Sequence, residues 1–203
     1  MSVAAVFLSD AAARLRASVV GIVAASRVSR RGGPSRGSGW GAGIAWGSDD
    51  LFVTSAHVVS AKAAIVVTPD GRAVEGAVVG RDAARDIAVV HASTAAVPRV
   101  TTSDPYALRP GSLVFAVGHP LGVKEAVSIG VFQAVGALPR GYGLNGKSGL
   151  VWVQADVRLA PGNSGGPIAD VEGNVIGVST MVVSGLALAV PVSEVERFVS
   201  RLG

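Results

Sequence analysis

The strongest candidate for a catalytic segment is short and rich in glycine: Pro161-Gly162-Asn163-Ser164-Gly165-Gly166-Pro167. A serine hydroxyl is a poor nucleophile and must be presented outward on a tight turn. Glycines on both sides allow such a turn and let a substrate backbone approach closely. They also leave the amides of Gly162 and Ser164, with Asn163 between them, free to point at one spot, as an oxyanion hole requires. The alternative is an ordinary glycine turn with an incidental serine, but so specific a sequence motif seldom arises by chance.

A serine nucleophile needs a general base, and the base needs an acid to orient it. The chain has three histidines. His57 follows a strand-like run, and the alanine before it and the valine pair after it indicate a short helical turn at the end of a barrel. His91 ends a predicted strand and His119 stands in a Gly-His-Pro turn, so we interpret both as packed or surface residues. His57 is therefore the candidate base.

The orienting acid must lie where a buried carboxylate can reach the imidazole. Asp86 opens a short apolar strand, which makes it the candidate. Asp82 lies four residues earlier in the preceding turn, and we interpret it as solvated. The pattern thus predicts a Ser164–His57–Asp86 triad.

The composition limits the alternatives. The chain has 203 residues, of which 49% are hydrophobic and 16% charged, and this balance excludes a disordered or fibrous protein. There are no cysteines, which excludes disulfides, cysteine-ligated zinc, iron–sulfur clusters and thiol catalysis. We expect no metal and no cofactor.

The elements that must hold the candidate residues are short strands joined by tight turns, because 27 glycines accompany many valine-rich runs. The patterning predicts two series of six strands: 19–24, 41–46, 51–54, 64–68, 73–80 and 86–91, then 112–117, 126–135, 150–156, 167–170, 175–183 and 186–191. Residues 92–111, rich in proline, serine and threonine, read as a connection. Two closed six-stranded barrels satisfy this layout, since closure removes sheet edges. We therefore expect an all-β protein divided into residues 1–97 and 98–203.

A helix is expected near each end of the chain. The first spans residues 8–17 with Ser9 as its N-cap. The second spans 193–202, where Ser193 and Glu196 suggest a capping box before an apolar stripe.

Charge and hydropathy argue against two other classes of partner. The net charge is +4, and four arginines lie in one stretch: Arg27, Arg30, Arg31 and Arg36. No aromatic residues are interleaved with them, so we favour a solvated basic loop over a nucleic-acid contact. The uncharged run 173–193 is interrupted by polar residues, glycines and Pro191, so it predicts two strands and not a membrane span.

Three motifs together resemble a known family. Thr54-Ser55-Ala56-His57-Val58-Val59, Asp86-Ile87-Ala88-Val89 and Gly162-Asn163-Ser164-Gly165-Gly166-Pro167, in that order, are similar to the trypsin-like serine proteases of the HtrA/Deg type. The order His, Asp, Ser is also that of chymotrypsin and not of subtilisin or the α/β-hydrolases. The resemblance continues through 118–122, 154–156, 173–177 and 189–191, and so covers most of residues 18–200.

The resemblance implies a chymotrypsin-like double barrel and a serine endopeptidase that needs no cofactor. Ser164 would be the nucleophile, His57 the general base and then acid, and Asp86 the residue that fixes the histidine tautomer. Unfolded or extended polypeptides would be cleaved through an acyl-enzyme, in protein quality control. The substrate strand would pair with the segment around Ser179–Val182, which includes Thr180 and Met181. Trimers are usual in the resembled family.

The sequence also departs from the family pattern. Ser55 and His119 stand where asparagines are usual, and no PDZ module fits after the second helix. Arg158 lies where the related pattern places the floor of the specificity pocket. If it points outward, apolar neighbours such as Leu188 would favour small aliphatic side chains; if it points inward, acidic side chains would be favoured. The outward alternative is preferred, because an unpaired buried guanidinium is costly.

Two further questions stay open from the sequence. A latent or inactive protease fold that acts as a chaperone or peptide-binding module is the alternative to an active enzyme. A complete chain without an export signal would be cytoplasmic, whereas a fragment of a longer precursor could be exported.

Overall fold

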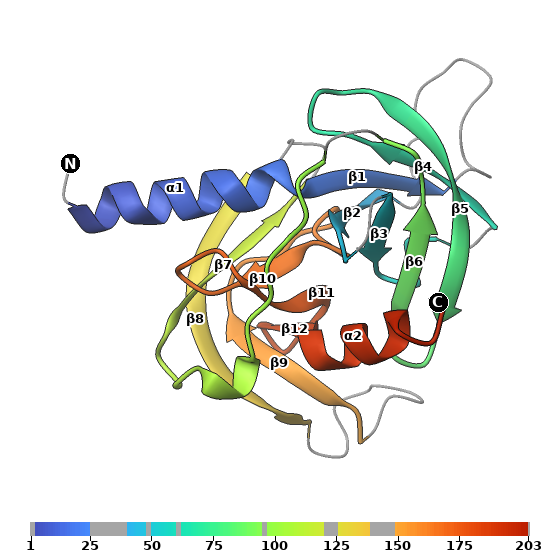
Figure 1. Cartoon of the computed structure of the whole chain (residues 1–203). Coiled ribbons are helices and arrows are strands. Elements are labelled where there is room, and N and C mark those ends of the chain that lie inside the picture. The colour runs from blue at the N-terminus through green and yellow to red at the C-terminus, as the bar shows by residue number, and fades with distance from the viewer. Residues whose placement is uncertain are drawn as a thin grey trace.

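Two closed barrels of six antiparallel strands lie side by side, with one helix near each end of the chain (Figure 1). The computed structural model describes residues 3–24, 40–47, 50–59, 62–94, 97–119, 126–138 and 149–202. The predicted all-β double barrel is thereby confirmed. The arginine-rich stretch that includes Arg27, Arg30, Arg31 and Arg36 lies outside the described residues.

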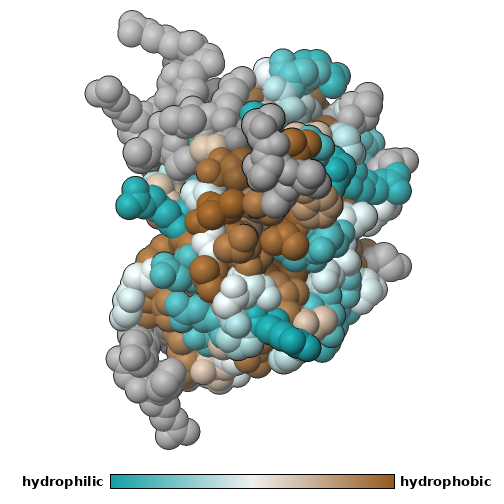
Figure 2. Space-filling view, turned by 90° about the vertical axis from the view of Figure 1, so that its left-hand side faces the viewer, coloured by the Kyte–Doolittle hydropathy of each residue, from teal (hydrophilic) through white to brown (hydrophobic). Residues whose placement is uncertain are grey.

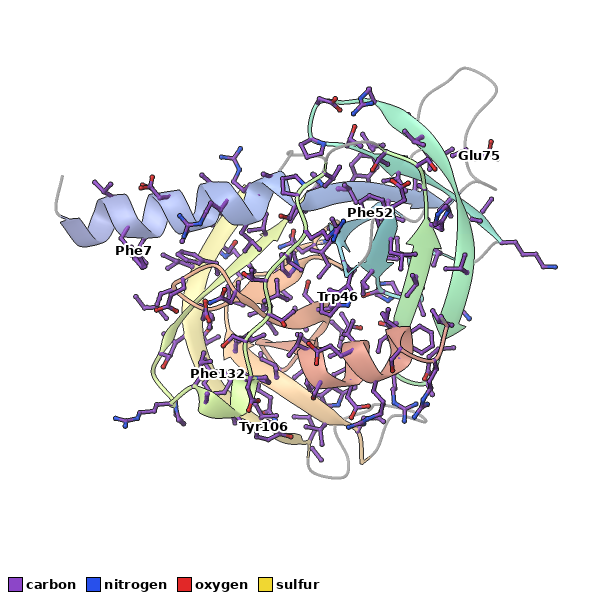
Figure 3. The ribbon with its side chains drawn as sticks, in the orientation of Figure 1. Phe7, Trp46, Phe52, Glu75, Tyr106 and Phe132 are labelled. Carbon is purple, nitrogen blue, oxygen red and sulfur yellow. The ribbon has the colours of Figure 1, made fainter. Side chains whose placement is uncertain are left out.

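The first barrel has the strand order β1-β2-β3-β6-β5-β4. Its strands are β1 (Val19–Ala24), β2 (Trp40–Ala45), β3 (Leu51–Thr54), β4 (Ala63–Val67), β5 (Ala73–Asp82) and β6 (Ile87–His91). β4 alternates between buried and half-buried residues, the period expected of a strand with one face toward a core. Phe52 is among the buried residues of this core and lies within the first barrel in Figure 3.

The second barrel has the strand order β10-β11-β12-β9-β8-β7. Its strands are β7 (Leu113–Gly118), β8 (Ala126–Ala137), β9 (Val151–Asp156), β10 (Pro167–Ala169), β11 (Val175–Val183) and β12 (Leu186–Pro191). The uncharged run near the C-terminus therefore forms β11 and β12, as predicted. Phe132 on β8 is buried in the core of this barrel (Figure 3).

A third apolar cluster fills the seam between the barrels. It joins Trp46, at the end of β2, to Phe115 on β7 and Trp152 on β9. In Figure 3, Trp46 lies at the middle of the molecule, between the two barrels. Burial of large aromatic side chains is strongly stabilising. The seam therefore fixes how residues of one barrel face residues of the other.

Both helices differ from their predicted ends. α1 runs from Val3 to Ala17, so Ser9 lies inside it and its hydroxyl donates to the Val6 carbonyl at 2.8 Å. The prediction of Ser9 as N-cap is therefore wrong. Ala11 and Leu15 of α1 belong to the seam cluster, and α1 contacts β7 of the second barrel.

α2 spans Val192–Val199 and begins after Pro191, with no side chain capping its first turn. The predicted capping box of Ser193 and Glu196 is wrong. Pro191 takes that position with φ −57°, and Glu196 instead accepts a hydrogen bond from the Thr102 hydroxyl at 3.2 Å. Neither helix, over the residues described, has the length and apolar character needed to cross a membrane.

The connection between the barrels is more ordered than the sequence predicted. It holds a short 3₁₀ helix, η2 (Pro105–Ala107), whose first turn is capped by Asp104. Before η2, the backbone bonds to Val175 on β11 from both sides: Val175 N donates to Thr101 O at 2.8 Å and Ser103 N donates to Val175 O at 2.9 Å. The division of the chain at residue 97 stays a prediction.

Candidate active site

His57 and Asp86 come from neighbouring strands of the first barrel. His57 lies in a turn that follows β3, and Asp86 directly precedes β6. The two strands pair antiparallel, with Thr54 opposite Ala88, so the end of one lies beside the start of the other. As a result His57 Nδ1 is 2.8 Å from Asp86 Oδ2, and the His57 backbone N–H donates to Asp86 Oδ1 at 3.0 Å.

The Asp86 carboxylate is buried but well supplied with donors. It is 4% exposed, and besides His57 it accepts a hydrogen bond from the Thr180 hydroxyl on β11. A buried carboxylate is tolerable when hydrogen bonds replace its hydration. Asp86 also has a left-handed φ of +63°, a conformation that non-glycine residues adopt infrequently and that the surrounding contacts must hold.

The His57 turn is held by its own barrel. The Arg81 Nε lies 3.1 Å from the carbonyl oxygens of both Ala56 and Val59, which flank the histidine. The Ala56 N–H donates to the Asp86 carbonyl at 3.2 Å. The His57 side chain is 51% exposed. With Nδ1 directed at Asp86, the Nε2 on the opposite side of the ring is left for another partner.

The other two histidines have surroundings that differ from those of His57. His91 is exposed at the end of β6. His119 is buried, and its ring meets the ring of Trp40 edge-on with centroids 6.0 Å apart. Both placements agree with the interpretation of surface and packed residues.

The loop of Ser164 packs tightly against the first barrel. Ala42 N on β2 donates to the Ser164 carbonyl at 2.8 Å. Gly165 has a φ of +86°, and a Cβ added there would lie 2.2 Å from the Ala42 carbonyl oxygen and 2.3 Å from Thr54 Oγ1. Only glycine allows both the left-handed backbone and this close approach. The glycines around Ser164 thus bring the loop to the side of the seam that carries His57.

The amides of the loop divide into two groups. Asn163 N donates to Ala160 O at 3.0 Å, and Gly165 N donates to Ser179 O at 2.7 Å. By contrast, the amides of Gly162 and Ser164 have no hydrogen-bond acceptor among the described residues. This is the arrangement that an oxyanion hole requires, because its donors must be free to meet the developing charge.

The Ser164 hydroxyl makes its hydrogen bond to β11 and not to the histidine. It donates to the Thr180 carbonyl at 3.3 Å. Hydrogen bonds between a nucleophile and its base are often loose in ligand-free sites and tighten when substrate binds. A rotation about the Cα–Cβ bond of Ser164 would turn the hydroxyl away from Thr180.

A pocket of about 430 Å³ opens beside Ser164. Its walls come from the loop before the serine and from β11, and are mostly apolar: Leu159, Ala160, Pro161, Asn163, Ser164, Thr180, Met181 and Val182. No group of three histidine, aspartate or glutamate side chains that could hold a metal ion occurs in the described ranges.

The predicted substrate-binding residues fall into two sets. Thr180 and Met181 line the pocket. Ser179 and Leu188 are buried in the protein interior, and Arg158 is exposed, so none of these three lines it. The exposed position of Arg158 corresponds to the outward alternative. Val182, the last residue of the segment expected to pair with substrate, also lines the pocket. Leu159, Ala160 and Pro161 line it without having been predicted as substrate contacts, although their nearness to Ser164 in the sequence was a usable signal.

The comparison with protein families decides the identity. A family model described as a trypsin-like peptidase domain matches residues 41–178, a range that holds His57, Asp86 and Ser164. The chain belongs to the trypsin-like peptidase domain family. Together with the relatives and solved structures below, this match confirms the resemblance to HtrA/Deg proteases at the level of the peptidase domain.

The relatives of this trypsin-like peptidase domain are named as serine proteases, and a similar solved structure is named as an HtrA-type protease. One relative is HhoB of Synechocystis sp., which is named as a serine protease. It is 35% identical over 171 residues, which cover 82% of this chain and 41% of HhoB. The bovine mitochondrial serine protease HTRA2 is 32% identical over 79% of this chain and 36% of its own length. A solved structure of the HtrA-type protease AlgW with a tripeptide has a TM-score of 0.82 and 25% identity, over 96% of this chain and 63% of that one. The chain thus spans less than half the length of HhoB and of HTRA2.

Proposed function

We propose that this trypsin-like peptidase domain is a serine endopeptidase that cleaves unfolded or extended polypeptides. One observation carries the proposal: the His57–Asp86 pair of the first barrel lies beside the Ser164 loop of the second, whose Gly162 and Ser164 amides have no acceptor among the described residues. Neither barrel alone supplies both parts.

The proposed mechanism assigns one step to each of these groups. His57 takes the proton of Ser164 as the hydroxyl attacks a peptide carbonyl, and later gives it to the leaving amine. Asp86 accepts the Nδ1–H of His57, which fixes the tautomer that leaves Nε2 as the base. The amides of Gly162 and Ser164 stabilise the oxyanion. Water then hydrolyses the acyl-enzyme, and no cofactor takes part.

The substrate would bind as an added strand beside β11. The pairing of β11 with β10 ends at Val178, while residues 181–183 pair with no strand other than β12 in the part of the chain that the structure describes. The other edge of this segment is therefore available for backbone hydrogen bonds to an extended peptide. The side chain before the scissile bond would enter the pocket beside Ser164, and its apolar lining and the exposed Arg158 favour an aliphatic side chain.

We further propose that the chain assembles into a homo-oligomer, a trimer by family resemblance. Figure 2 shows a band of hydrophobic surface on the side of the molecule where α1, β7 and β8 lie. Exposed large apolar residues on these elements are Val6, Phe7, Leu113, Val127, Ile129 and Val131. An exposed apolar patch of this kind is typical of a protein–protein interface.

The location follows as a separate proposal. A Halomonas elongata relative, 33% identical, is named as a probable periplasmic DegP-like endoprotease. Of the two locations that the sequence leaves open, this name supports export. Fractionation of cells that make the protein would test it.

Hydrolysis of unfolded casein by the purified domain tests the activity. We expect the parent to cleave casein and Ser164→Ala to lose at least a thousandfold in rate, because only oxyanion and binding effects remain. Equal rates in the two proteins would overturn the proposal. Binding of casein without turnover by the parent would instead support the alternative of an inactive, peptide-binding module.

A further inference from the structure

Ser179 is a buried serine at the meeting point of the two loops of the site. It is 1% exposed, so it does not face the pocket. Its hydroxyl lies 2.7 Å from the carbonyl oxygen of Asn163 and 2.9 Å from that of Gly166. Both neighbours are acceptors, so the hydroxyl is the donor, and its shorter contact is to Asn163.

The Asn163 carbonyl belongs to the same peptide unit as the Ser164 amide. A peptide unit is planar and trans, so its C=O and N–H point in opposite directions. The Asn163 carbonyl also accepts the Gly166 N–H at 2.9 Å. Two donors on one side of the unit therefore hold the Ser164 N–H toward the other side, where it has no acceptor among the described residues.

The same serine is tied to the His57 turn. The Ser55 hydroxyl, fully buried, donates to the Ser179 carbonyl at 3.0 Å. That carbonyl also accepts the Gly165 N–H at 2.7 Å, and the Ser179 N–H donates to Gly166 O at 2.8 Å. Ser179 thus contacts the nucleophile loop through its hydroxyl, amide and carbonyl, and the histidine turn through Ser55.

We propose that Ser179 is a positioning residue whose hydroxyl orients the Asn163–Ser164 peptide so that the Ser164 amide serves the oxyanion hole. The role rests on the proposed peptidase function and replaces the expectation that Ser179 binds substrate. Preorganised donors act at the charge that develops in the transition state. Removal of the hydroxyl should therefore slow the chemical step and leave the affinity for the reagent or substrate unchanged.

The test is the rate of phosphonylation by a fluorophosphonate, which needs no knowledge of the natural substrate. We expect Ser179→Ala to lower the maximal rate of inactivation about tenfold, the order of one lost hydrogen bond, with half-saturation changed less than twofold. Ser179→Thr keeps the hydroxyl and should retain most of the rate. Ser18→Ala, which alters another buried serine at the junction of α1 and β1, should label like the parent.

The outcomes separate this role from the function on which it rests. An unlabelled, folded parent overturns both. A labelled parent and a Ser179→Ala variant with the same maximal rate overturn the positioning role alone, as does a variant in which only half-saturation changes. If the alanine variant does not fold, Ser179→Cys keeps the shape with a much weaker donor, and a rate equal to that of the parent in this variant overturns the role.

Discussion

Asp86 is the residue on which the orientation of His57 depends. Its carboxylate contacts both the ring and the backbone N–H of the histidine, and Thr180 contacts it from the other barrel. Asp86→Asn keeps the size of the side chain but presents an amide that can hold the imidazole in the wrong tautomer. We expect kcat on a peptide substrate to fall by about four orders of magnitude.

Circular dichroism and thermal unfolding of the Asp86→Asn variant provide the control, since the substitution should leave the barrels folded. A loss of less than tenfold in a folded variant would contradict the role of Asp86.

The residues with local signals could be predicted from the sequence, and those without could not. Ser164 lies in a glycine-rich motif, and His57 and Asp86 lie next to the ends of predicted strands. Thr180 and Ser179 act through contacts with residues 13 to 124 positions away. Nothing in the local pattern of β11 distinguishes a buried hydroxyl that serves a neighbouring loop from one that binds substrate, so Ser179 was assigned to the substrate.

At the scale of elements, a cluster of charges joins the turn before Asp86 to α2. The Arg85 guanidinium contacts Asp82 at 2.8 Å and Glu194 of α2 at 3.2 Å. Partial burial raises the pKa of Asp82, but hydrogen bonds from the Arg85 backbone and side chain outweigh it and hold this pKa below its usual range. The same hydrogen bond with Asp82 raises the pKa of Arg85. Asp82 is thus paired and not simply solvated.

This cluster predicts an acid-sensitive contribution to stability. Because the pKa of Asp82 is lower in the folded state, its stabilisation is present above the unfolded value of about 3.9 and is lost as the pH falls through the folded value. Arg85→Met should lower Tm by about 2–4 °C at pH 7. The gap between parent and variant should begin to narrow as the pH falls below about 4.

Calorimetry across this pH range measures the effect. Arg109→Met is a matched control, because Arg109 is exposed and has no ion pair among the described residues. A gap for Arg85→Met that stays constant down to pH 3 would contradict the account.

Element ends show where prediction from sequence fails. Four strands were predicted with their observed bounds: β1, β3, β11 and β12. The helix starts were missed because residues 3–7 have no N-terminal signal and because Pro191 replaces a side-chain cap at α2. The position of a turn can therefore be predicted from sequence more reliably than the first residue of a helix, which depends on the group that satisfies its free amides.

At the scale of the whole molecule, the apolar band over α1, β7 and β8 predicts self-association. Ile129 on β8 is 54% exposed and lies opposite Phe115 of β7. Ile129→Glu places a charge in the band, and burial of an unpaired charge at an interface is costly. We expect the parent to sediment as an oligomer and this variant to shift toward the monomer.

Val79→Glu is the matched control, since Val79 is a similarly exposed strand residue, 48% exposed on β5 of the first barrel. Sedimentation velocity of the three proteins decides the question. A monomeric parent, or an Ile129→Glu variant as oligomeric as Val79→Glu, would contradict the proposed interface.

The central claim is that the two barrels together activate Ser164. Intact-mass spectrometry after treatment with a fluorophosphonate tests it most directly, because the reagent reacts with a serine that has a working base and oxyanion hole. The account predicts one adduct on the parent and none on Ser164→Ala. An unmodified, folded parent, or an equal adduct on both proteins, would contradict it.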